Sequence, residues 1–217
     1  QNMMAAASGM AATGLIPFVT TFAVFSLRAI EQARLSIAYA KRNVKIVSSH
    51  PGLDVGPDGA SAQAFEDLAM FRSIPNMVVI SPADSHEIAQ ATEAIIKYQG
   101  PVYMRTGRSP CPRILGENYN FEIGKGKIII DGHDLTIFAI GVEVHRAIEA
   151  SKKLKSDGVE ARVVNISTLK PIDVELIKKC VKETGCLVTA EDHNILGGLG
   201  GAVSEVVAQN CPCPIEF

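Results

Sequence analysis

Short apolar segments rich in β-branched residues alternate with segments of helical periodicity along almost the whole chain. Strands that alternate with helices in this way predict an α/β fold with mainly parallel sheets. The strands are almost continuously apolar, which indicates that helices cover both faces of each sheet. The apolar segments are residues 44–49, 77–82, 100–106, 127–131, 134–141, 161–167 and 186–191. The helical segments are residues 26–41, 85–98, 143–158 and 173–185.

The stretch TGRSPCPRILGENYNFEIGKGK, residues 106–127, interrupts this alternation. It contains two prolines and four glycines and has little periodicity, which is typical of a linker. A chain of 217 residues is long enough for two ordinary domains, each with its own core. We therefore expect two three-layer α/β domains, at residues 1–110 and 124–217, joined by a linker at residues 111–123.

The composition argues against several classes of function. Lysines and arginines number 21 against 23 aspartates and glutamates, so a net charge of −2 gives no electrostatic basis for binding nucleic acid. No apolar segment is long enough for a membrane helix, and no secretion signal is recognisable. We expect a cytoplasmic protein that binds neither nucleic acid nor membranes. The five cysteines are scattered, and Cys211 and Cys213 lack the partners that a zinc site would need, so we expect free thiols.

A loop rich in glycine and acidic residues follows the apolar segment 44–49. It carries His50, Asp54 and Asp58. Because ligands of open α/β sheets bind at the carboxyl ends of strands, these side chains lie where a ligand would bind. The glycines of the loop, Gly52, Gly56 and Gly59, permit tight turns. Taken alone, the pattern is equally consistent with an ordinary connection between a strand and a helix.

Longer motifs resemble a known family. GPDGASAQAFEDLAMFRSIPNMVVISPAD, residues 56–84, resembles the pyrimidine-binding domain of transketolases. TFAVFSLRAIEQARLS, residues 21–36, is similar to an aromatic-rich helix start in the same domain. LKPID and EDHNILGGLGGAVSE resemble the C-terminal domain that transketolases share with 1-deoxyxylulose-5-phosphate synthases. The resemblance implies a thiamine diphosphate-dependent enzyme that transfers a two-carbon ketol unit between sugar phosphates.

The resemblance also gives meaning to the first residues. Transketolases carry a GxAEQNM motif at a helix start, and this chain begins with QNM. The catalytic glutamate of the family would then immediately precede Gln1, so we expect no catalytic residue within the chain. That acid hydrogen-bonds the aminopyrimidine ring of the cofactor and favours the tautomer that acts as an internal base. We expect both domains to be truncated, the first before Gln1 and the second after the segment CPIEF.

Three residues correspond to cofactor-binding positions of the family. The resemblance places the ring of Phe25 against the aminopyrimidine, with Phe22 and Arg28 beside it. Without the resemblance, the i, i+3 spacing of the two phenylalanines would favour core packing. Transketolases often have tyrosine at the position of Arg28, and FSLRAIEQ is closer to the FxxRAxDQ pattern of the deoxyxylulose phosphate synthases. The subfamily is left open by this difference.

Three further residues correspond to substrate contacts. The resemblance assigns His50 and Asp58 to the sugar hydroxyls, and Arg108 to the phosphate, for which guanidinium offers a fixed fork of donors. Arg105 is a second candidate for the phosphate, and the alternative is that both arginines pair with surface carboxylates. Ala62 replaces a histidine of the family motif, so one group near the cofactor or substrate is absent.

The resemblance further implies a partner. In this family a GDG…N motif in a separate domain holds the diphosphate and its Mg²⁺, and this chain lacks that motif. We expect no metal ligand here and a transketolase N-terminal (diphosphate-binding) domain or subunit as partner, in a homodimer or a heterotetramer. Open alternatives are a 1-deoxyxylulose-5-phosphate synthase, the beta subunit of a 2-oxo-acid dehydrogenase, and a non-catalytic partner subunit.

The remaining histidines and the second glycine-rich run gain no such support. The run ILGGLGGAV lacks a GxGxxG pattern directly after a strand with an acid beyond it, so we expect no dinucleotide site. Four histidines are expected to be structural or exposed: His86, His133, His145 and His193.

Overall fold

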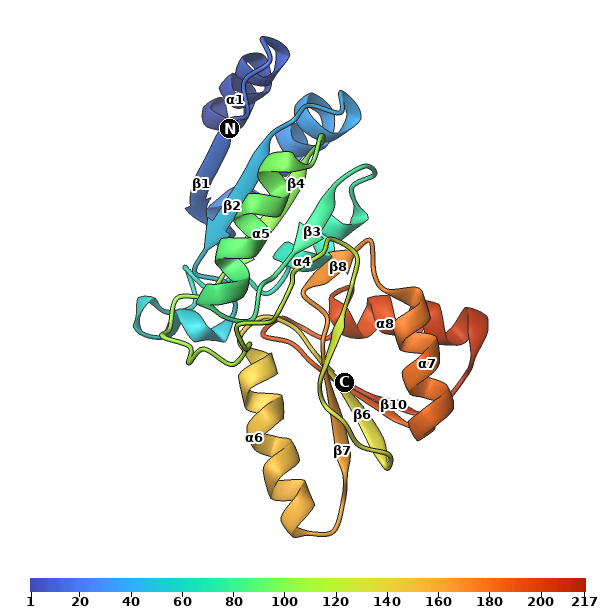
Figure 1. The fold of residues 1–217 in the computed structure, drawn as a ribbon. Helices are drawn as coiled ribbons and strands as arrows, with labels where there is room; N and C mark the ends of the chain where they lie inside the picture. Colours follow the sequence, from blue (N-terminus) through green and yellow to red (C-terminus); the bar gives the residue numbers. More distant parts are fainter.

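The computed structural model describes residues 1–217 and contains two five-stranded sheets (Figure 1). Neighbouring strands pair in parallel except at two edges, where β8 runs antiparallel to β3 and β5 runs antiparallel to β7. The predicted α/β fold with mainly parallel sheets is confirmed. The first sheet has the order β1 (Phe18–Phe22), β2 (Lys45–Ser49), β4 (Val102–Thr106), β3 (Val78–Ile80) and β8 (Thr168–Lys170). The second has the order β10 (Ile215–Glu216), β9 (Leu187–Ala190), β6 (Leu135–Ala139), β7 (Ala161–Asn165) and β5 (Lys127–Ile130).

Helices connect the parallel strands, and local sequence signals account for several of their ends. The side chain of Asp84 caps α5 by accepting a hydrogen bond from the amide of Glu87. Asp173 caps α7 in the same way, and Gly185 ends α7 in the left-handed conformation. The helices of the first half are α1 (Asn2–Ala12), α2 (Ala23–Leu27), α3 (Ile30–Gln32), π-helical η1 (Ala33–Tyr39), 3₁₀-helical η2 (Leu53–Asp58), α4 (Asp67–Ser73) and α5 (Ser85–Lys97). Those of the second half are α6 (Glu143–Ser156), α7 (Val174–Thr184) and α8 (Leu199–Asn210).

Helices pack on both faces of the first sheet. Tyr103 belongs to a cluster that includes residues of η1 and α4, and its ring stacks on Phe71 of α4 at a centroid distance of 3.8 Å. The next residue along β4, Met104, packs with Ala91 and Ile95 of α5. Because successive side chains of a strand point to opposite faces, the two clusters make this half a three-layer structure.

The second sheet is covered in the same manner. Phe138 of β6 packs in the cluster that contains residues of α7 and α8, whereas its neighbour Ile137 packs with residues of α6. The helical spacing of α6 correctly predicts its buried stripe, which consists of Val144, Ala147, Ile148 and Ser151.

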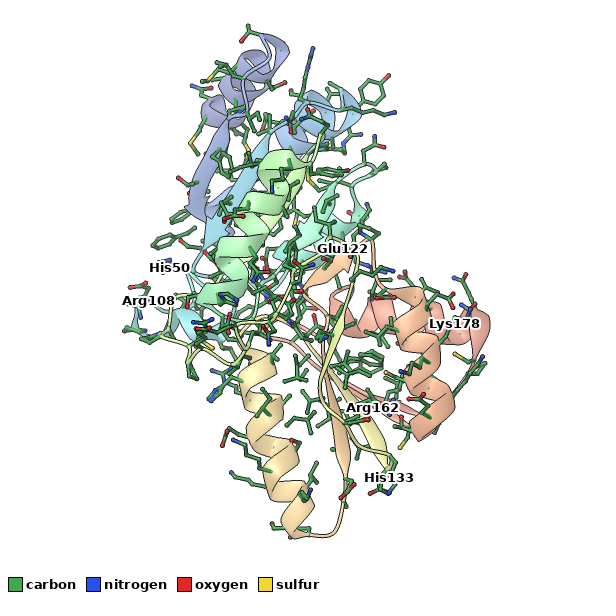
Figure 2. All side chains as sticks on the ribbon, viewed as in Figure 1. His50, Arg108, Glu122, His133, Arg162 and Lys178 are labelled. Atoms are coloured by element: carbon green, nitrogen blue, oxygen red, sulfur yellow. The ribbon has the colours of Figure 1, made fainter.

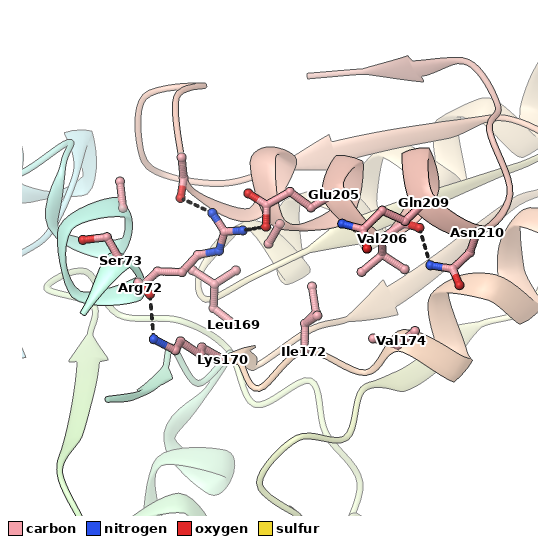
Figure 3. Close-up of a pocket in the computed structure, with 13 residues that line it drawn as sticks. Arg72, Ser73, Leu169, Lys170, Ile172, Val174, Glu205, Val206, Gln209 and Asn210 are labelled. Atoms are coloured by element: carbon pink, nitrogen blue, oxygen red, sulfur yellow. Dashed lines mark hydrogen bonds and ion pairs between the residues drawn. The ribbon is translucent and has the colours of Figure 1, made fainter. Parts of the chain in front are cut away.

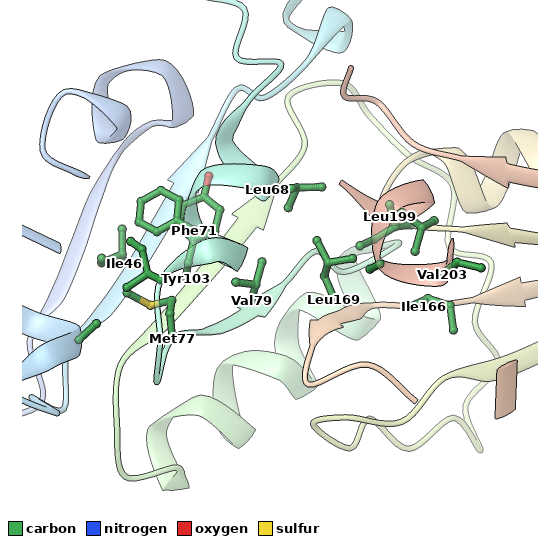
Figure 4. Packing of buried hydrophobic residues seen from close by; sticks show 14 of the residues in the cluster. Ile46, Leu68, Phe71, Met77, Val79, Tyr103, Ile166, Leu169, Leu199 and Val203 are labelled. Atoms are coloured by element: carbon green, nitrogen blue, oxygen red, sulfur yellow. The ribbon is translucent and has the colours of Figure 1, made fainter. Parts of the chain in front are cut away.

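One apolar cluster of 29 buried residues extends through both halves (Figure 4). It runs from Leu68 and Phe71 of α4, through Leu169 of β8, to Leu199 and Val203 of α8. Strand β8 comes from the second half of the sequence but pairs with β3 of the first sheet. The two halves therefore share both a core and a sheet.

The segment between the halves is fixed by two buried acids of the first half. Asp84 accepts hydrogen bonds from the amides of residues 114–115, at 2.8 and 2.9 Å. Glu87 accepts from the Tyr119 hydroxyl and, at 3.0 Å, from the side chain of Asn165 in β7. Burial, with the neighbouring Glu87 carboxylate adding to it, raises the pKa of Tyr119 far above its ordinary value. The connection is thus an ordered part of the structure.

Two strands, the helix α8 and the breaks in one helix were not predicted. β1 contains two threonines and exposes Phe18 and Thr20, while β8 has only three residues, so neither shows a continuous apolar run. Both form because a neighbouring strand, β2 or β3, supplies the backbone partners. The helix expected over residues 26–41 is divided among the end of α2, α3 and η1.

Candidate active site at the carboxyl ends of the first sheet

The strand register brings three chain segments to one edge of the first sheet. Phe22 of β1 lies opposite Ser49 of β2, and Ser49 lies opposite Thr106 of β4. The residues that follow these strands therefore leave the sheet side by side. Figure 2 shows His50 and Arg108 close to each other at this end of the first sheet, on the left of the view. This is the end of the sheet at which the glycine-rich loop predicts a ligand site.

Aromatic rings line one side of the candidate site. The rings of Phe22 and Phe25 are nearly parallel, with centroids 5.7 Å apart, and the ring of Phe22 stacks on His50 at 3.8 Å. Phe25 is 58% exposed, which is unusual for so large an apolar side chain. The core-packing interpretation of the two phenylalanines is therefore wrong for Phe25. An exposed ring beside a second ring can receive a flat heterocycle by stacking.

Arg28 lies at the end of the helix that carries Phe25. It is the residue that follows α2, and it is exposed. Its carbonyl oxygen accepts a hydrogen bond from Nε2 of Gln1 at 3.3 Å. The start of α1 and the end of α2 therefore meet beside the phenylalanines.

An ion pair joins two of the predicted substrate residues. Nε of Arg108 lies 3.5 Å from Oδ2 of Asp58, and both side chains are partly exposed. His50 lies in the left-handed region, with φ of 57°, and its Nδ1 contacts the hydroxyl of Ser49 at 2.9 Å. The structure thus brings together an imidazole, a carboxylate and a guanidinium at the same end of the sheet.

Arg105 does not belong to this group, contrary to the hypothesis that it is a second phosphate contact. Its side chain is 3% exposed, and its Nε lies 3.1 Å from Oδ2 of the fully buried Asp67. The hydroxyl of Tyr103 donates to the same oxygen at 2.7 Å. Burial raises the pKa of Tyr103, and the Asp67 carboxylate raises it further. Arg105 therefore neutralises a buried acid, which the alternative interpretation anticipated in part.

The loop acid Asp54 is also engaged by the protein. Its Oδ2 accepts a hydrogen bond from the amide of Ser109 at 3.1 Å, and Oδ1 lies 3.4 Å from Nη2 of Arg146. Its side chain is only 8% exposed, so it holds the loop rather than facing solvent. Ala62 is buried as well and adds no polar group.

His193 and the second glycine-rich run have structural contacts. His193 is buried, with Nε2 accepting from the amide of Ala69 at 3.4 Å, so its Nδ1 donates to the Asn194 carbonyl at 2.7 Å. In the run ILGGLGGAV, the first amides of α8 donate to the carboxylate of Glu191. The amino terminus of this helix is therefore occupied by the protein itself, which agrees with the absence of a dinucleotide motif.

Sequence reasoning overlooked two residues of the second half that reach this edge, Asp192 and Arg146. Asp192 accepts hydrogen bonds from the amides of Leu53 and Asp54, and Arg146 pairs with Asp54. Asp192 directly follows a predicted strand, so the rule that drew attention to His50 also applies to it. Arg146 lies on a helix and carries no such signal.

A cavity of about 740 Å³ lies elsewhere, between α4, β8 and α8 (Figure 3). Its cations are already paired: Arg72 contacts Glu205 and the carbonyl of Gly197, and Lys170 donates to the carbonyl of Arg72. Burial lowers the pKa of Lys170, and the neighbouring Arg72 lowers it further. None of the predicted site residues lines this cavity, so we place the candidate site at the strand ends.

Three classes of feature are absent among residues 1–217. No three His, Cys, Asp or Glu side chains converge in a way that could hold a metal ion. No helix combines the length and the apolar character that crossing a membrane requires. The cysteines have no disulfide partners in the structure.

Comparisons with known proteins agree with the architecture. The family model for the transketolase pyrimidine binding domain matches residues 1–113, and that for the transketolase C-terminal domain matches residues 124–215. A protein of Methanocaldococcus jannaschii described as a transketolase C-terminal section is 51% identical over 213 residues, covering 97% of this chain and 66% of the relative. An apulose-4-phosphate transketolase subunit of Phocaeicola vulgatus is 36% identical, covering 100% of this chain and 70% of the relative.

Solved structures show the same relationship. A split-gene transketolase, described as an inactive beta4 tetramer, superimposes with a TM-score of 0.93 at 44% identity, covering 99% of this chain and 70% of that chain. The Campylobacter jejuni transketolase shares the fold, with a TM-score of 0.78 at 22% identity, over 95% of this chain and 35% of that chain. The chain spans about two thirds of its shorter relatives and 34% of the human transketolase. It belongs to the transketolase family, of which it contains the pyrimidine-binding and C-terminal domains.

Proposed function

We propose that this chain is the C-terminal subunit of a split transketolase and supplies the aminopyrimidine-binding half of the active site. The observation that carries the proposal is that the exposed ring of Phe25 and the ion pair of Asp58 and Arg108 lie at the same end of the first sheet. A flat heterocycle and an anionic sugar could both bind there. The similarity to the split-gene transketolase supports the subunit arrangement.

The cofactor would be thiamine diphosphate, and the aromatic surface fits its aminopyrimidine. Phe25 offers an exposed face, Phe22 stacks beside it, and the exposed Arg28 ends the helix that carries Phe25. When bound, the cofactor stabilises the carbanion that carries the two-carbon unit. The expected catalytic acid before Gln1 would stand near these residues, because Gln1 contacts the carbonyl of Arg28.

The substrate would be a ketose with an anionic terminal group. Arg108 would bind that group, and His50 and Asp58 would bind hydroxyls close to the reacting carbon. A guanidinium suits phosphate and sulfonate alike because it presents several N–H donors in one plane. Both chemistries occur among the relatives' names, which include an apulose-4-phosphate transketolase subunit and a 6-deoxy-6-sulfo-D-fructose transketolase subunit.

The Mg²⁺ and the diphosphate would be bound by a transketolase N-terminal domain or subunit. In the described residues no set of ligands converges on a metal position. The assembly would be a heterotetramer if the partner is a separate subunit, or a homodimer if the partner is a domain of the same chain. The relatives named above are transketolases or transketolase subunits, which favours ketol transfer over the synthase and dehydrogenase alternatives.

The test mixes the full-length subunit with its N-terminal partner, thiamine diphosphate, Mg²⁺, xylulose 5-phosphate and ribose 5-phosphate. We expect sedoheptulose 7-phosphate to form with both subunits present and no turnover with either one alone. Product from neither this pair nor a sulfonated or branched sugar would contradict the proposal. Turnover of pyruvate would instead select the synthase or the dehydrogenase alternative.

A further inference from the structure

A carboxylate from the second half of the chain lies beneath the loop that carries His50 and Asp58. Asp192 lies just after the end of β9 and is only 8% exposed. Its Oδ1 accepts a hydrogen bond from the amide of Leu53 at 2.8 Å, and its Oδ2 accepts one from the amide of Asp54 at 3.2 Å. One carboxylate therefore fixes two consecutive amides at the start of η2.

The contact leaves room only for glycine at position 52. A Cβ atom on Gly52 would lie 2.2 Å from the carboxyl carbon of Asp192, which is far inside van der Waals distance. Gly52 also has φ of 63° and ψ of −159°, a conformation that other residues adopt at a substantial cost. The backbone of the loop thus lies against the Asp192 carboxylate at a distance that no residue with a Cβ atom could keep.

Asp192 is itself held in place from the first sheet. Nη2 of Arg105 donates to the carbonyl oxygen of Asp192 at 2.5 Å, and Arg105 is anchored by the buried Asp67. The carboxylate therefore has a rigid support.

The loop in turn contacts the segment that carries Arg108. The carboxylate of Asp54 accepts from the amide of Ser109, and the Ser109 hydroxyl donates to the Asp54 carbonyl at 3.3 Å. Ser109 is the neighbour of Arg108, which pairs with Asp58 at the end of η2. Arg146 of α6 adds a contact to Asp54 from the second half.

We propose that Asp192 is a positioning residue for the substrate: it fixes the loop from Gly52 to Asp58 so that His50, Asp58 and Arg108 face one sugar. This inference depends on the proposed function, because it concerns the same site. It gives the C-terminal domain a part in substrate binding without requiring it to touch the substrate.

A neighbouring residue provides a matched control. Glu191 is also buried and also accepts hydrogen bonds from two consecutive amides, those of Leu199 and Gly200, at 2.7 and 2.9 Å. It too approaches a glycine, Gly198, too closely for a Cβ atom. The two acids differ in what they hold: Glu191 orders the first amides of α8 in its own half, whereas Asp192 orders a loop of the first half.

The kinetic test compares Asp192→Asn with Glu191→Gln in the complex with the N-terminal subunit. Each change removes one charge and turns one acceptor into a donor that faces an amide. For Asp192→Asn we expect KM for the ketose phosphate to rise about tenfold, the size of one charge-assisted hydrogen bond. For Glu191→Gln we expect KM to stay within about twofold of the original protein. Equal KM values for all three proteins, or an equal rise in both variants, would overturn the inference.

A second measurement does not depend on activity. Amide hydrogen exchange of the full-length chain should become faster in residues 50–58 with Asp192→Asn, and in the first turn of α8 with Glu191→Gln. Unchanged exchange in residues 50–58 would also overturn the inference. If the original protein shows no turnover, the proposed function fails while the exchange result still decides whether Asp192 orders the loop.

A milder variant covers the case in which Asp192→Asn does not fold. Arg146 is 54% exposed, so Arg146→Ala should leave the fold intact while removing the second contact to Asp54. We expect KM for the ketose phosphate to rise about two- to threefold with kcat unchanged, as one partly exposed ion pair allows. No rise in KM would count against the coupling between the second half and the substrate residues.

Discussion

Nε of Arg108 lies 3.5 Å from Oδ2 of Asp58, so each side chain neutralises the other when no substrate is present. The side chains are 34% and 41% exposed, and water therefore screens the pair, which contributes little to stability. In the proposed function a phosphate group would replace Asp58 as the partner of Arg108 without uncovering a buried charge. The two residues consequently give separable predictions.

Arg108→Ala should weaken the binding of phosphorylated sugars selectively. Loss of charge-assisted hydrogen bonds to the phosphate should raise KM at least about tenfold. KM for an unphosphorylated ketose should stay within about twofold, since no phosphate is present to lose its partner. Steady-state kinetics with both substrates measures the difference. An equal change for the two substrates would assign Arg108 a structural role.

Asp58→Ala should affect both substrates alike. The carboxylate is proposed to accept a hydrogen bond from a sugar hydroxyl, which phosphorylated and unphosphorylated ketoses share. We expect kcat/KM to fall about tenfold for both, the effect of losing one hydrogen bond to a charged group. A loss confined to phosphorylated sugars would mean that Asp58 acts only through Arg108.

Phe25→Ala should weaken the cofactor complex but not the fold. Because the ring is 58% exposed, the free energy of unfolding should change by less than about 0.5 kcal/mol. Loss of stacking should raise the Kd for thiamine diphosphate at least about threefold, as measured by titration of the two-subunit complex. The control is Phe71→Ala, where loss of a fully buried ring should destabilise the protein by about 3–5 kcal/mol. Unaltered cofactor affinity in Phe25→Ala would exclude the stacking role.

Arg105→Ala should be much more damaging to stability than Arg108→Ala. It would leave the buried carboxylate of Asp67 without its cation, at a cost of about 3–5 kcal/mol. Arg108→Ala removes a solvent-screened pair and should cost less than about 1 kcal/mol. Urea unfolding of the two variants measures both values. Similar losses in the two variants would mean that the Arg105 pair is not truly desolvated.

Lys45 should show an unusual dependence on pH. Its side chain is buried and donates to the carbonyls of Tyr98 and Gly100, and burial lowers its pKa from 10.5 to about 8. Between pH 8 and 10.5 the unfolded state keeps a proton that the folded state has lost, so the free energy of unfolding should rise with pH. The rise should be about 3 kcal/mol at most and absent from Lys45→Met.

Urea unfolding of both proteins across this pH range measures the difference, and NMR titration of the lysine side chain gives the pKa directly. Tyrosines and other groups that titrate at alkaline pH are common to both proteins and cancel in the comparison. A normal pKa of Lys45 together with parallel stability curves would contradict the prediction.

The sequence predicts most of the architecture because periodicity is a local property. The stripe of α6 and the strands at 44–49 and 161–167 follow from residues within each segment. β8 could not be predicted, since three residues become a strand only through pairing with β3, which is distant in the sequence. The same holds for η1, whose π-helical turns leave no pattern in the residues.

The candidate site shows the same limit. The place of His50 and Asp58 at this end of the sheet is predictable because their loop follows a strand. The binding roles of these two residues and of Phe22, Phe25 and Arg28 are implied by the family resemblance alone and stay predictions. Nothing local distinguishes Arg105 from Arg108. Their roles differ because Arg105 contacts the buried Asp67 of α4, whereas Arg108 contacts the partly exposed loop acid Asp58.

The second half contributes β8 to the first sheet, and this pairing limits where the chain can be divided. Dividing the chain within residues 111–123 would put β3 and β8 on different products. The first product would then expose an edge of β3, and β8 of the second product would have no strand to pair with. Such a division would also cut the shared core between Leu169 and Leu68. A break in this segment would therefore separate two halves that depend on each other for a strand partner and for part of their core.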